Sequence, residues 1–159
     1  MIIIGSDHTG IDLKKQIITY LNKNKVDVQD VTSFVNQEGD DYPDVAYSIS
    51  KKVLEYSNNL GIAICGTGIG ICISCNKVVG IRAALCTDEY MSEMSRRHNN
   101  ANVLCLGART SAAENKELIE KMVDKFINTS FEGGRHEKRI DKIASLESNS
   151  SEGRYTHDS

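Results

Sequence analysis

The chain has 159 residues, of which 40% are hydrophobic and 26% charged, and its formal net charge is −3. This length suits one domain that can bury roughly 70% of the surface of its unfolded chain, and the composition argues against a disordered protein or a membrane protein. The small negative charge gives no basic field, so we do not expect nucleic acid as a partner.

The first third of the chain alternates strand and helix patterns. The opening MIIIGSD is a short, continuous apolar run, typical of a strand buried on both faces. Residues 10–25 carry an apolar stripe that predicts a helix, with the lysines largely off that stripe. Residues 26–31 alternate with period two and predict a second strand. A polar loop over 32–42 then leads to a helix that begins at Pro43, behind an acidic cap.

The remainder of the chain continues this alternation. Strands are predicted at 61–65, 81–85 and 103–107, and helices at 69–76, 88–100, 111–128 and 135–146. The connections are long enough for right-handed crossovers, so we predict an α/β fold in three layers, with a five-stranded parallel sheet between helices. We expect one domain over residues 1–147 and a flexible tail over 148–159, where Ser, Asn, Gly and charged residues prevail.

Cysteine usage and the amino terminus bear on the compartment. The five cysteines are Cys65, Cys72, Cys75, Cys86 and Cys105. Their odd number and spacing predict reduced thiols rather than a disulfide framework. The opening has no basic leader and is too short for a signal peptide or a membrane span. We therefore expect a soluble, cytoplasmic protein. The C-x-x-C pair, Cys72 and Cys75, could belong to a zinc or redox site. No second ligand pair is obvious in the sequence, so we expect these two cysteines to be buried thiols.

Polar and small residues follow three of the predicted strands, in the segments GSDHTG, CGTGIG and CTDEY. Because the carboxyl ends of parallel strands meet at one edge, we expect Asp7, His8, Cys65 and Thr67 to gather there. Glycine amides at a helix start hold negative charge, and a helix start also favours a thiolate at Cys65. The stretch could be a phosphate cradle, a base or nucleophile, a metal site, or a tight turn around a buried cysteine.

Two features lie further along the chain. His98 ends a predicted helix and is expected to be exposed. Arg135 and Arg139 are four residues apart and share one helix face, where two guanidinium groups match a phosphate, although a solvated basic face is the alternative. The G-x-G pattern after Cys65 is only a weak match to a dinucleotide fingerprint. A non-enzymatic, flavodoxin-like nucleotide-binding module is therefore the rival to an enzyme.

Five motifs occur together in the order GSDHTG, DYPD, CGTGIGICISCNKVVGIRAAL, RRHNNANVLCLGAR and FEGGRHEKRI. Over about residues 1–147 the chain thereby resembles the ribose/galactose isomerase family. The resemblance implies a Rossmann-like fold and a metal-free aldose–ketose isomerase without a cofactor. The expected reaction interconverts ribose 5-phosphate and ribulose 5-phosphate through a cis-enediolate, in the non-oxidative pentose phosphate pathway; the alternative substrate is allose 6-phosphate or galactose 6-phosphate. The resemblance also implies a homodimer with shared active sites, or a dimer of dimers.

The resemblance assigns catalytic roles by position. Cys65 would move a proton between C1 and C2 of the opened sugar, and Thr67 would assist proton transfer at the oxygens. His98, from the partner subunit, would open the furanose ring, with Tyr42 nearby. Some members use a glutamate further along the loop instead of the cysteine. This chain has Ile71 at that position and follows the cysteine pattern.

Binding roles are implied in the same way. The loop backbone would form an anion hole for the enediolate, from Gly66, Gly68, Ile69 and Gly70. The sugar hydroxyls would be contacted by Asp7 and Asn99. The phosphate would be held, in part across the dimer interface, by His8, Arg109, Arg135 and Arg139.

Overall fold

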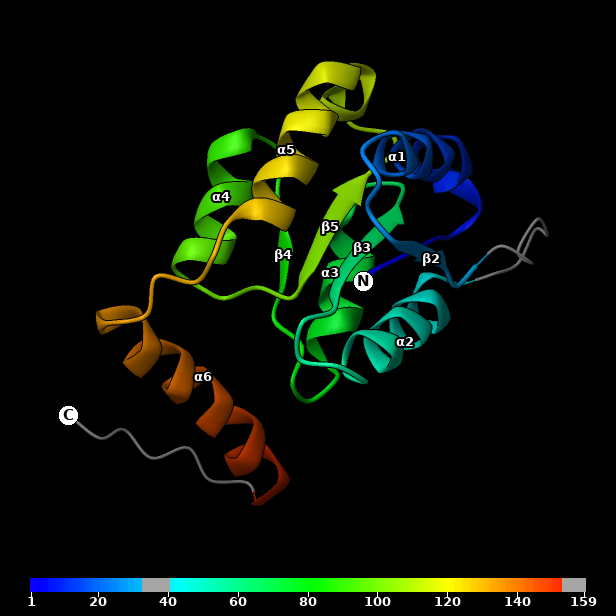
Figure 1. The fold of residues 1–159 in the computed structure, drawn as a ribbon. Helices are drawn as coiled ribbons and strands as arrows, with labels where there is room; N and C mark the ends of the chain where they lie inside the picture. Colours follow the sequence, from blue (N-terminus) through cyan, green and yellow to red (C-terminus); the bar gives the residue numbers. More distant parts are fainter. Residues whose placement is uncertain (33–40, 153–159) are drawn as a thin grey trace.

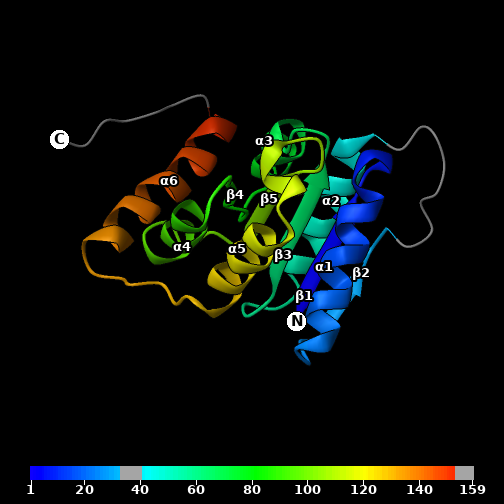
Figure 2. The ribbon, with the colours of Figure 1, turned by 90° about the horizontal axis from the view of Figure 1, so that it is seen from above.

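The structure is a computed structural model that describes residues 1–32 and 41–152, so most of the predicted loop at 32–42 lies outside the described residues. One sheet of five parallel strands has the order β2-β1-β3-β5-β4 (Figures 1 and 2). The strands are β1 (Ile2–Ser6), β2 (Val28–Asp30), β3 (Leu60–Cys65), β4 (Ala83–Leu85) and β5 (Val103–Gly107). The predicted five-stranded parallel sheet is confirmed, although β2 and β4 are shorter than predicted.

Helices cover both faces of the sheet. The main helices are α1 (Ile11–Lys23), α2 (Tyr42–Val53), α3 (Ile69–Asn76), α4 (Glu89–Arg97), α5 (Lys116–Asn128) and α6 (Arg135–Glu152). Successive strand residues point to opposite faces, so β3 sends Ile62 and Ile64 into a core with α1 and α5. The alternate residues Ala63 and Cys65 enter a second core with α2 and α3. These two cores give the predicted three layers.

Three of the predicted helices differ from the observed ones by three residues or more. The helix predicted at 88–100 is α4 and ends at Arg97. The helix predicted at 111–128 is divided into a short 3-10 helix, η2 (Ser111–Glu114), and α5. The division falls at Asn115, whose side-chain Oδ1 accepts a hydrogen bond from the backbone N–H of Leu118 at 3.1 Å and so caps α5.

The last helix, α6, runs on to Glu152, beyond the predicted end at residue 146, so the predicted tail begins inside this helix; residues 153–159 lie outside the described part. Figure 1 shows α6 projecting from the three-layer body, beside the carboxyl end of α4. Near its far end, the Glu147 carboxylate accepts a hydrogen bond from the Gly80 N–H at 3.3 Å. None of the helices in the described part of the chain has the length and apolar character needed to cross a bilayer.

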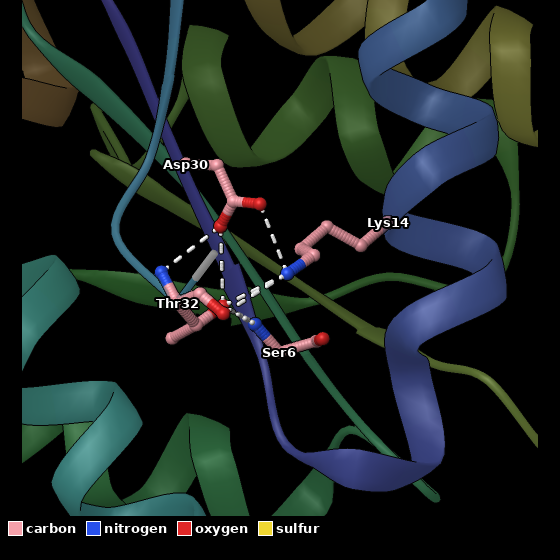
Figure 3. A network of polar contacts seen from close by, with 4 residues as sticks. All are labelled: Ser6, Lys14, Asp30 and Thr32. Atoms are coloured by element: carbon pink, nitrogen blue, oxygen red, sulfur yellow. Dashed lines mark hydrogen bonds and ion pairs between the residues drawn. The ribbon is translucent and has the colours of Figure 1, made fainter. Parts of the chain in front are cut away.

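A buried polar network joins α1 to the ends of β1 and β2 (Figure 3). Lys14 is buried, contrary to the expectation that the lysines lie off the apolar stripe, and its Nζ is 3.0 Å from Oδ2 of Asp30. The Thr32 hydroxyl accepts hydrogen bonds from the Lys14 Nζ at 3.2 Å and from the Ser6 N–H at 3.1 Å. The charge of Lys14 is therefore tolerated inside because a carboxylate and a hydroxyl surround it.

Replacing Lys14 with methionine is expected to destabilise the fold. The variant leaves Asp30, whose side chain is only 21% exposed, without its ionic partner. Because Asp30 keeps some contact with solvent, we expect a loss of about 2 kcal/mol in the free energy of unfolding, less than for a fully buried pair. Urea denaturation measures this loss. The control is Lys15→Met, an exposed neighbour on the same helix; equal stability of the two variants would contradict the role assigned to Lys14.

Candidate active site

Cys65 is the last residue of β3, the central strand of the sheet. Its side chain is only 4% exposed and faces the core beneath α2 and α3. The Cys65 carbonyl accepts a hydrogen bond from the Ala108 N–H at 2.9 Å, which continues the pairing with β5. Pairing with β5 therefore fixes the backbone of Cys65, and pairing with β1 fixes that of Ile64, the residue before it.

The loop after Cys65 turns back over the thiol. The Gly68 N–H donates a hydrogen bond to the Cys65 Sγ at 3.2 Å, and Gly68 has a φ of +80°, which favours glycine. A Cβ on Gly68 would also lie 2.6 Å from Cδ1 of Leu85 and 2.9 Å from the carbonyl carbon of Leu106. Only glycine therefore lets the backbone pass this close to the sheet. The prediction of a tight glycine turn around Cys65 agrees with this geometry.

The helix α3 starts directly after Gly68 and offers backbone N–H groups near the thiol. The first hydrogen bond within this helix runs from the Cys72 N–H to the Gly68 carbonyl at 3.1 Å. The Thr67 Oγ1 accepts from the Ile69 N–H at 3.2 Å. The N–H groups of Gly70 and Ile71 lie in the first turn, where no carbonyl of the helix stands four residues earlier to accept them. They are therefore available as donors to an oxyanion at this edge.

The ends of β1 and β5 bring further polar groups to the same edge. Asp7 follows β1 and is buried, and its Oδ1 accepts hydrogen bonds from the Thr9 N–H at 3.0 Å and the Thr9 hydroxyl at 2.6 Å. The N–H of Arg109, two residues after β5, donates to the Gly66 carbonyl at 2.8 Å. A Cβ on Gly66 would lie 3.7 Å from both the Arg109 Cδ and the Thr9 Oγ1. These side chains therefore flank the loop.

Tyr42 and His8 complete this first group of residues. Tyr42 is the first residue of α2, and its ring packs directly on Gly70, where a Cβ would lie 2.7 Å from two ring carbons. His8 is exposed in a short 3-10 helix, η1 (His8–Gly10), next to Asp7. The structure therefore brings nine of the predicted site residues to one edge, together with Thr9, which was not predicted: Asp7, His8, Tyr42, Cys65, Gly66, Thr67, Gly68, Gly70 and Arg109. Ile69, the tenth member of this group, starts α3 and is exposed.

The other four predicted residues lie elsewhere in the chain. His98 follows α4, just before β5 begins at Val103, whereas Cys65 pairs with Gly107 at the other end of β5. Four residue steps separate Val103 from Gly107, which at about 3.3 Å per step is about 13 Å. Asn99 directly follows His98. Arg135 and Arg139 belong to α6, which begins beside the carboxyl end of α4 (Figure 1). A single chain therefore does not bring His98 to Cys65.

This second group has an ordered structure of its own. The imidazole rings of His98 and His136 stack with centroids 4.2 Å apart and an angle of 12° between their planes. The Nε2 of His136 lies 3.7 Å from Oε1 of Glu132, and Oε2 of Glu132 lies 3.3 Å from Nη2 of Arg97. Burial of the His136 ring, with the neighbouring His98 and arginines, holds the pKa of His136 below its ordinary value, and Glu132 acts in the opposite sense. His136 and Glu132 were not predicted, although both lie in the FEGGRHEKRI motif.

The remaining thiols are free and mostly buried. Cys72 is half-buried on α3, and a hydrogen bond with the Cys105 thiol, opposed by burial, lowers the pKa of Cys72 to about 7. The same partner lowers the pKa of Cys75, while the pKa of Cys105 is raised. Burial raises the pKa of Cys86 to about 12. Cys72 and Cys75 therefore share a third thiol from β5, which the sequence motif alone did not indicate.

Comparison with known proteins points to one family. The family model described as Ribose/Galactose Isomerase matches residues 2–143. The chain is 47% identical over 147 residues to the probable ribose-5-phosphate isomerase B of Mycoplasma genitalium, covering 92% of this chain and 95% of that protein. It is 40% identical over 146 residues to the D-erythrulose-4-phosphate isomerase of Pectobacterium atrosepticum, covering 92% of this chain and 94% of that protein.

A solved structure gives the same result. The crystal structure of ribose-5-phosphate isomerase B from Mycoplasma genitalium with bound ribulose-5-phosphate superposes with a TM-score of 0.85. The two chains are 45% identical, and the match covers 92% of this chain and 95% of that one.

Proposed function

The chain belongs to the ribose/galactose isomerase family, and from that premise we propose that it interconverts ribose 5-phosphate and ribulose 5-phosphate. The observation that carries this proposal is the likeness, over nearly the whole chain, to a relative solved with ribulose-5-phosphate bound. A coupled assay that follows ribulose 5-phosphate formation, with and without a chelator, tests it. A protein that binds nucleotide and shows no isomerase activity would instead support the flavodoxin-like alternative.

The edge of the sheet at which the strands end, called the carboxyl edge below, supplies the groups that the isomerisation requires. Moving hydrogen between C1 and C2 requires a base for a weakly acidic C–H proton and a store for the negative charge that then develops on oxygen. Cys65 is the base, because its Sγ lies under the loop and accepts the Gly68 N–H. The N–H groups at the start of α3, which have no backbone acceptor in the described part of the chain, stabilise the cis-enediolate. The Thr67 hydroxyl assists proton transfer between the oxygens of the enediolate. Asp7 and, from the other edge, Asn99 bind the sugar hydroxyls.

The active site is shared between two copies of the chain. His98, which opens the furanose ring, precedes Val103 at the start of β5, whereas Cys65 pairs with Gly107, about 13 Å further along that strand. A ring-opening group must contact the sugar that Cys65 deprotonates. A second copy in a homodimer therefore provides His98 and Asn99, and each dimer holds two equivalent sites. Two such dimers pairing again would leave this arrangement unchanged.

The phosphate is held by cationic side chains from both edges. Arg135 and Arg139 are exposed on one face of the first turns of α6, and neither forms an ion pair among the residues described. Their guanidinium groups are therefore available for a phosphate. His8 and Arg109 contribute from the carboxyl edge. Phosphate binding, remote from the reacting carbons, positions C1 and C2 against Cys65.

Replacing Arg139 with alanine is expected to raise KM for ribose 5-phosphate about tenfold and to change kcat much less, because the lost contact binds ground state and transition state alike. Steady-state kinetics measures both constants. Lys138→Ala is the matched control, since Lys138 is exposed on the same turn of α6. Unchanged kinetics for Arg139→Ala would remove this residue from the phosphate site.

The length of the sugar is a property in which relatives of this chain differ. One relative, 40% identical, is named a D-erythrulose-4-phosphate isomerase, so this scaffold serves sugars of different length. Parallel assays on ribose 5-phosphate, erythrulose 4-phosphate, allose 6-phosphate and galactose 6-phosphate measure the preference. We propose that kcat/KM is highest for the five-carbon substrate and that the enzyme serves the non-oxidative pentose phosphate pathway in the cytoplasm.

A further inference from the structure

We propose that His136 is a positioning residue for His98: its buried ring lies flat against the ring of His98 and fixes the orientation in which that residue meets the sugar. The inference rests on the proposed isomerase activity and deepens it. It concerns a side chain to which neither the sequence motifs nor the comparisons assign a role.

The first support is the contrast in burial along one turn of α6. Arg135 and Arg139 are exposed, whereas His136 is only 4% exposed. A histidine buried to this extent ordinarily has partners for its polar atoms, but the Nε2 of His136 has no hydrogen bond among the described residues. Its nearest charged neighbour, Oε1 of Glu132, is 3.7 Å away, which is too long for a hydrogen bond. The His136 ring therefore interacts through its flat face rather than through a hydrogen bond of its Nε2.

The second support is that the His98 side chain forms no hydrogen bond or ion pair among the described residues, so the stack is its one recorded interaction there. It is the residue that ends α4, and its N–H donates to the Met94 carbonyl at 2.9 Å, so its backbone is fixed. Its half-buried side chain contacts the ring of His136 over a nearly parallel face, at 4.2 Å between centroids. Terminal ring torsions have broad energy wells, and a packed flat neighbour narrows them. The stack therefore fixes the plane in which the His98 nitrogens lie.

The third support is the charge around the pair. Two stacked imidazoles repel each other if both are protonated, and burial together with His98, Arg135 and Arg139 lowers the pKa of His136. Glu132, which acts in the opposite sense, is itself paired with Arg97 at 3.3 Å. The lowered pKa favours the neutral form of His136, which avoids charge repulsion within the stack. Because the unfolded chain protonates His136 more readily, the stability of the fold decreases as the pH falls below about 6.5.

A metal ion is a less suitable explanation for this cluster. One ligand atom from each of His98, Glu132 and His136 lies within 4.8 Å of the others, which is close enough for an ion. A histidine nitrogen, however, binds a metal in the plane of its ring, and the two rings lie face to face at only 12°. Both rings would have to rotate out of the stack to share one ion. The observed packing therefore favours positioning.

Two reaction rates distinguish a positioning role of His136 from a general structural role. Conversion of ribose 5-phosphate requires ring opening. Exchange of deuterium from solvent into C1 of ribulose 5-phosphate requires only proton abstraction, because a ketose phosphorylated at C5 has no free hydroxyl there to close a furanose ring. Both rates are measured by NMR, with chelator present and absent. A wild-type protein that showed neither rate would refute the isomerase activity itself, and the role of His136 is then void with it.

For His136→Ala we expect kcat/KM for ribose 5-phosphate to fall about tenfold, while C1 exchange stays within about threefold of wild type. His136→Phe keeps a flat ring and should restore conversion to within about threefold. Lys138→Ala is the control and should change neither rate. If circular dichroism shows that His136→Ala is unfolded, His136→Gln takes its place.

Three results would overturn the inference while leaving the isomerase activity intact. The first is wild-type conversion by His136→Ala. The second is an equal loss of conversion and exchange, which would indicate damage to the fold. The third is a phenylalanine variant no better than alanine, or conversion abolished by chelator, because either would show that the histidine nitrogen rather than the ring face is required.

Discussion

Replacing Cys65 with alanine is expected to lower kcat about 10³-fold, because the variant keeps the anion-binding loop and loses the base. The thiol lies at the end of the central strand and accepts a hydrogen bond from the Gly68 N–H. The variant loses that hydrogen bond but keeps the strand pairing that supports the start of the loop. Binding of ribulose 5-phosphate, measured by calorimetry, should therefore persist. Exchange of deuterium into C1 should fall together with conversion, since both steps use this base.

The matched control is Cys72→Ser, which alters a half-buried thiol seven residues along the chain. Its activity should stay near that of wild type, although hydrogen bonding with Cys105 lowers the pKa of Cys72 to about 7 and makes it open to alkylation as well. Alkylating reagents should accordingly inactivate the Cys72→Ser variant as they do wild type. A Cys65→Ala variant that retains more than about a tenth of wild-type kcat would contradict the assignment of the base.

For His98→Ala we expect kcat/KM with ribose 5-phosphate to fall about 10²-fold, because the variant depends on the small open-chain fraction of the sugar. Exchange of deuterium into C1 of ribulose 5-phosphate should stay within a few-fold of wild type, since the ketose needs no ring opening. NMR in deuterated solvent follows both reactions in one sample. Equal losses in the two reactions would count against a ring-opening role.

Mixing the two variants tests whether the sites are shared. After denaturation and refolding together, about half of the dimers should contain one Cys65→Ala chain and one His98→Ala chain. Each such dimer has one site with both residues intact, so about a quarter of wild-type activity should return. Mixtures that stay as inactive as the separate variants would show that His98 and Cys65 act within one chain.

Much of the fold followed from local patterns in the sequence. The strands at the centre of the sheet, β1, β3 and β5, are short apolar runs, and they were predicted almost to the residue because both of their faces are buried. The edge strands β2 and β4 were predicted too long, since their outer residues lack a second neighbour. The clustering at the carboxyl ends of the strands followed from topology, because parallel strands place Asp7, Cys65 and Thr67 together.

Other features depend on contacts between distant segments, which periodicity does not report. Lys14 was expected outside the apolar stripe, but Asp30 and Thr32, which lie beyond α1 in the sequence, make its burial favourable. The stack of His98 on His136 joins α4 to α6 across 38 positions of the chain, and no local pattern encodes such a pairing. The resemblance implied a shared site, but the separation of His98 from Cys65 within one chain needed the order and register of the strands.

The separation of Cys65 from His98 also bears on how this scaffold can diverge after gene duplication. Two copies that associate with each other need only one complete site between them. With the shared site proposed above, one copy can lose Cys65 and the other His98 without loss of all activity. Each copy could afterwards survive only with the other, so the proposed division predisposes this scaffold to become an obligate pair of unlike subunits.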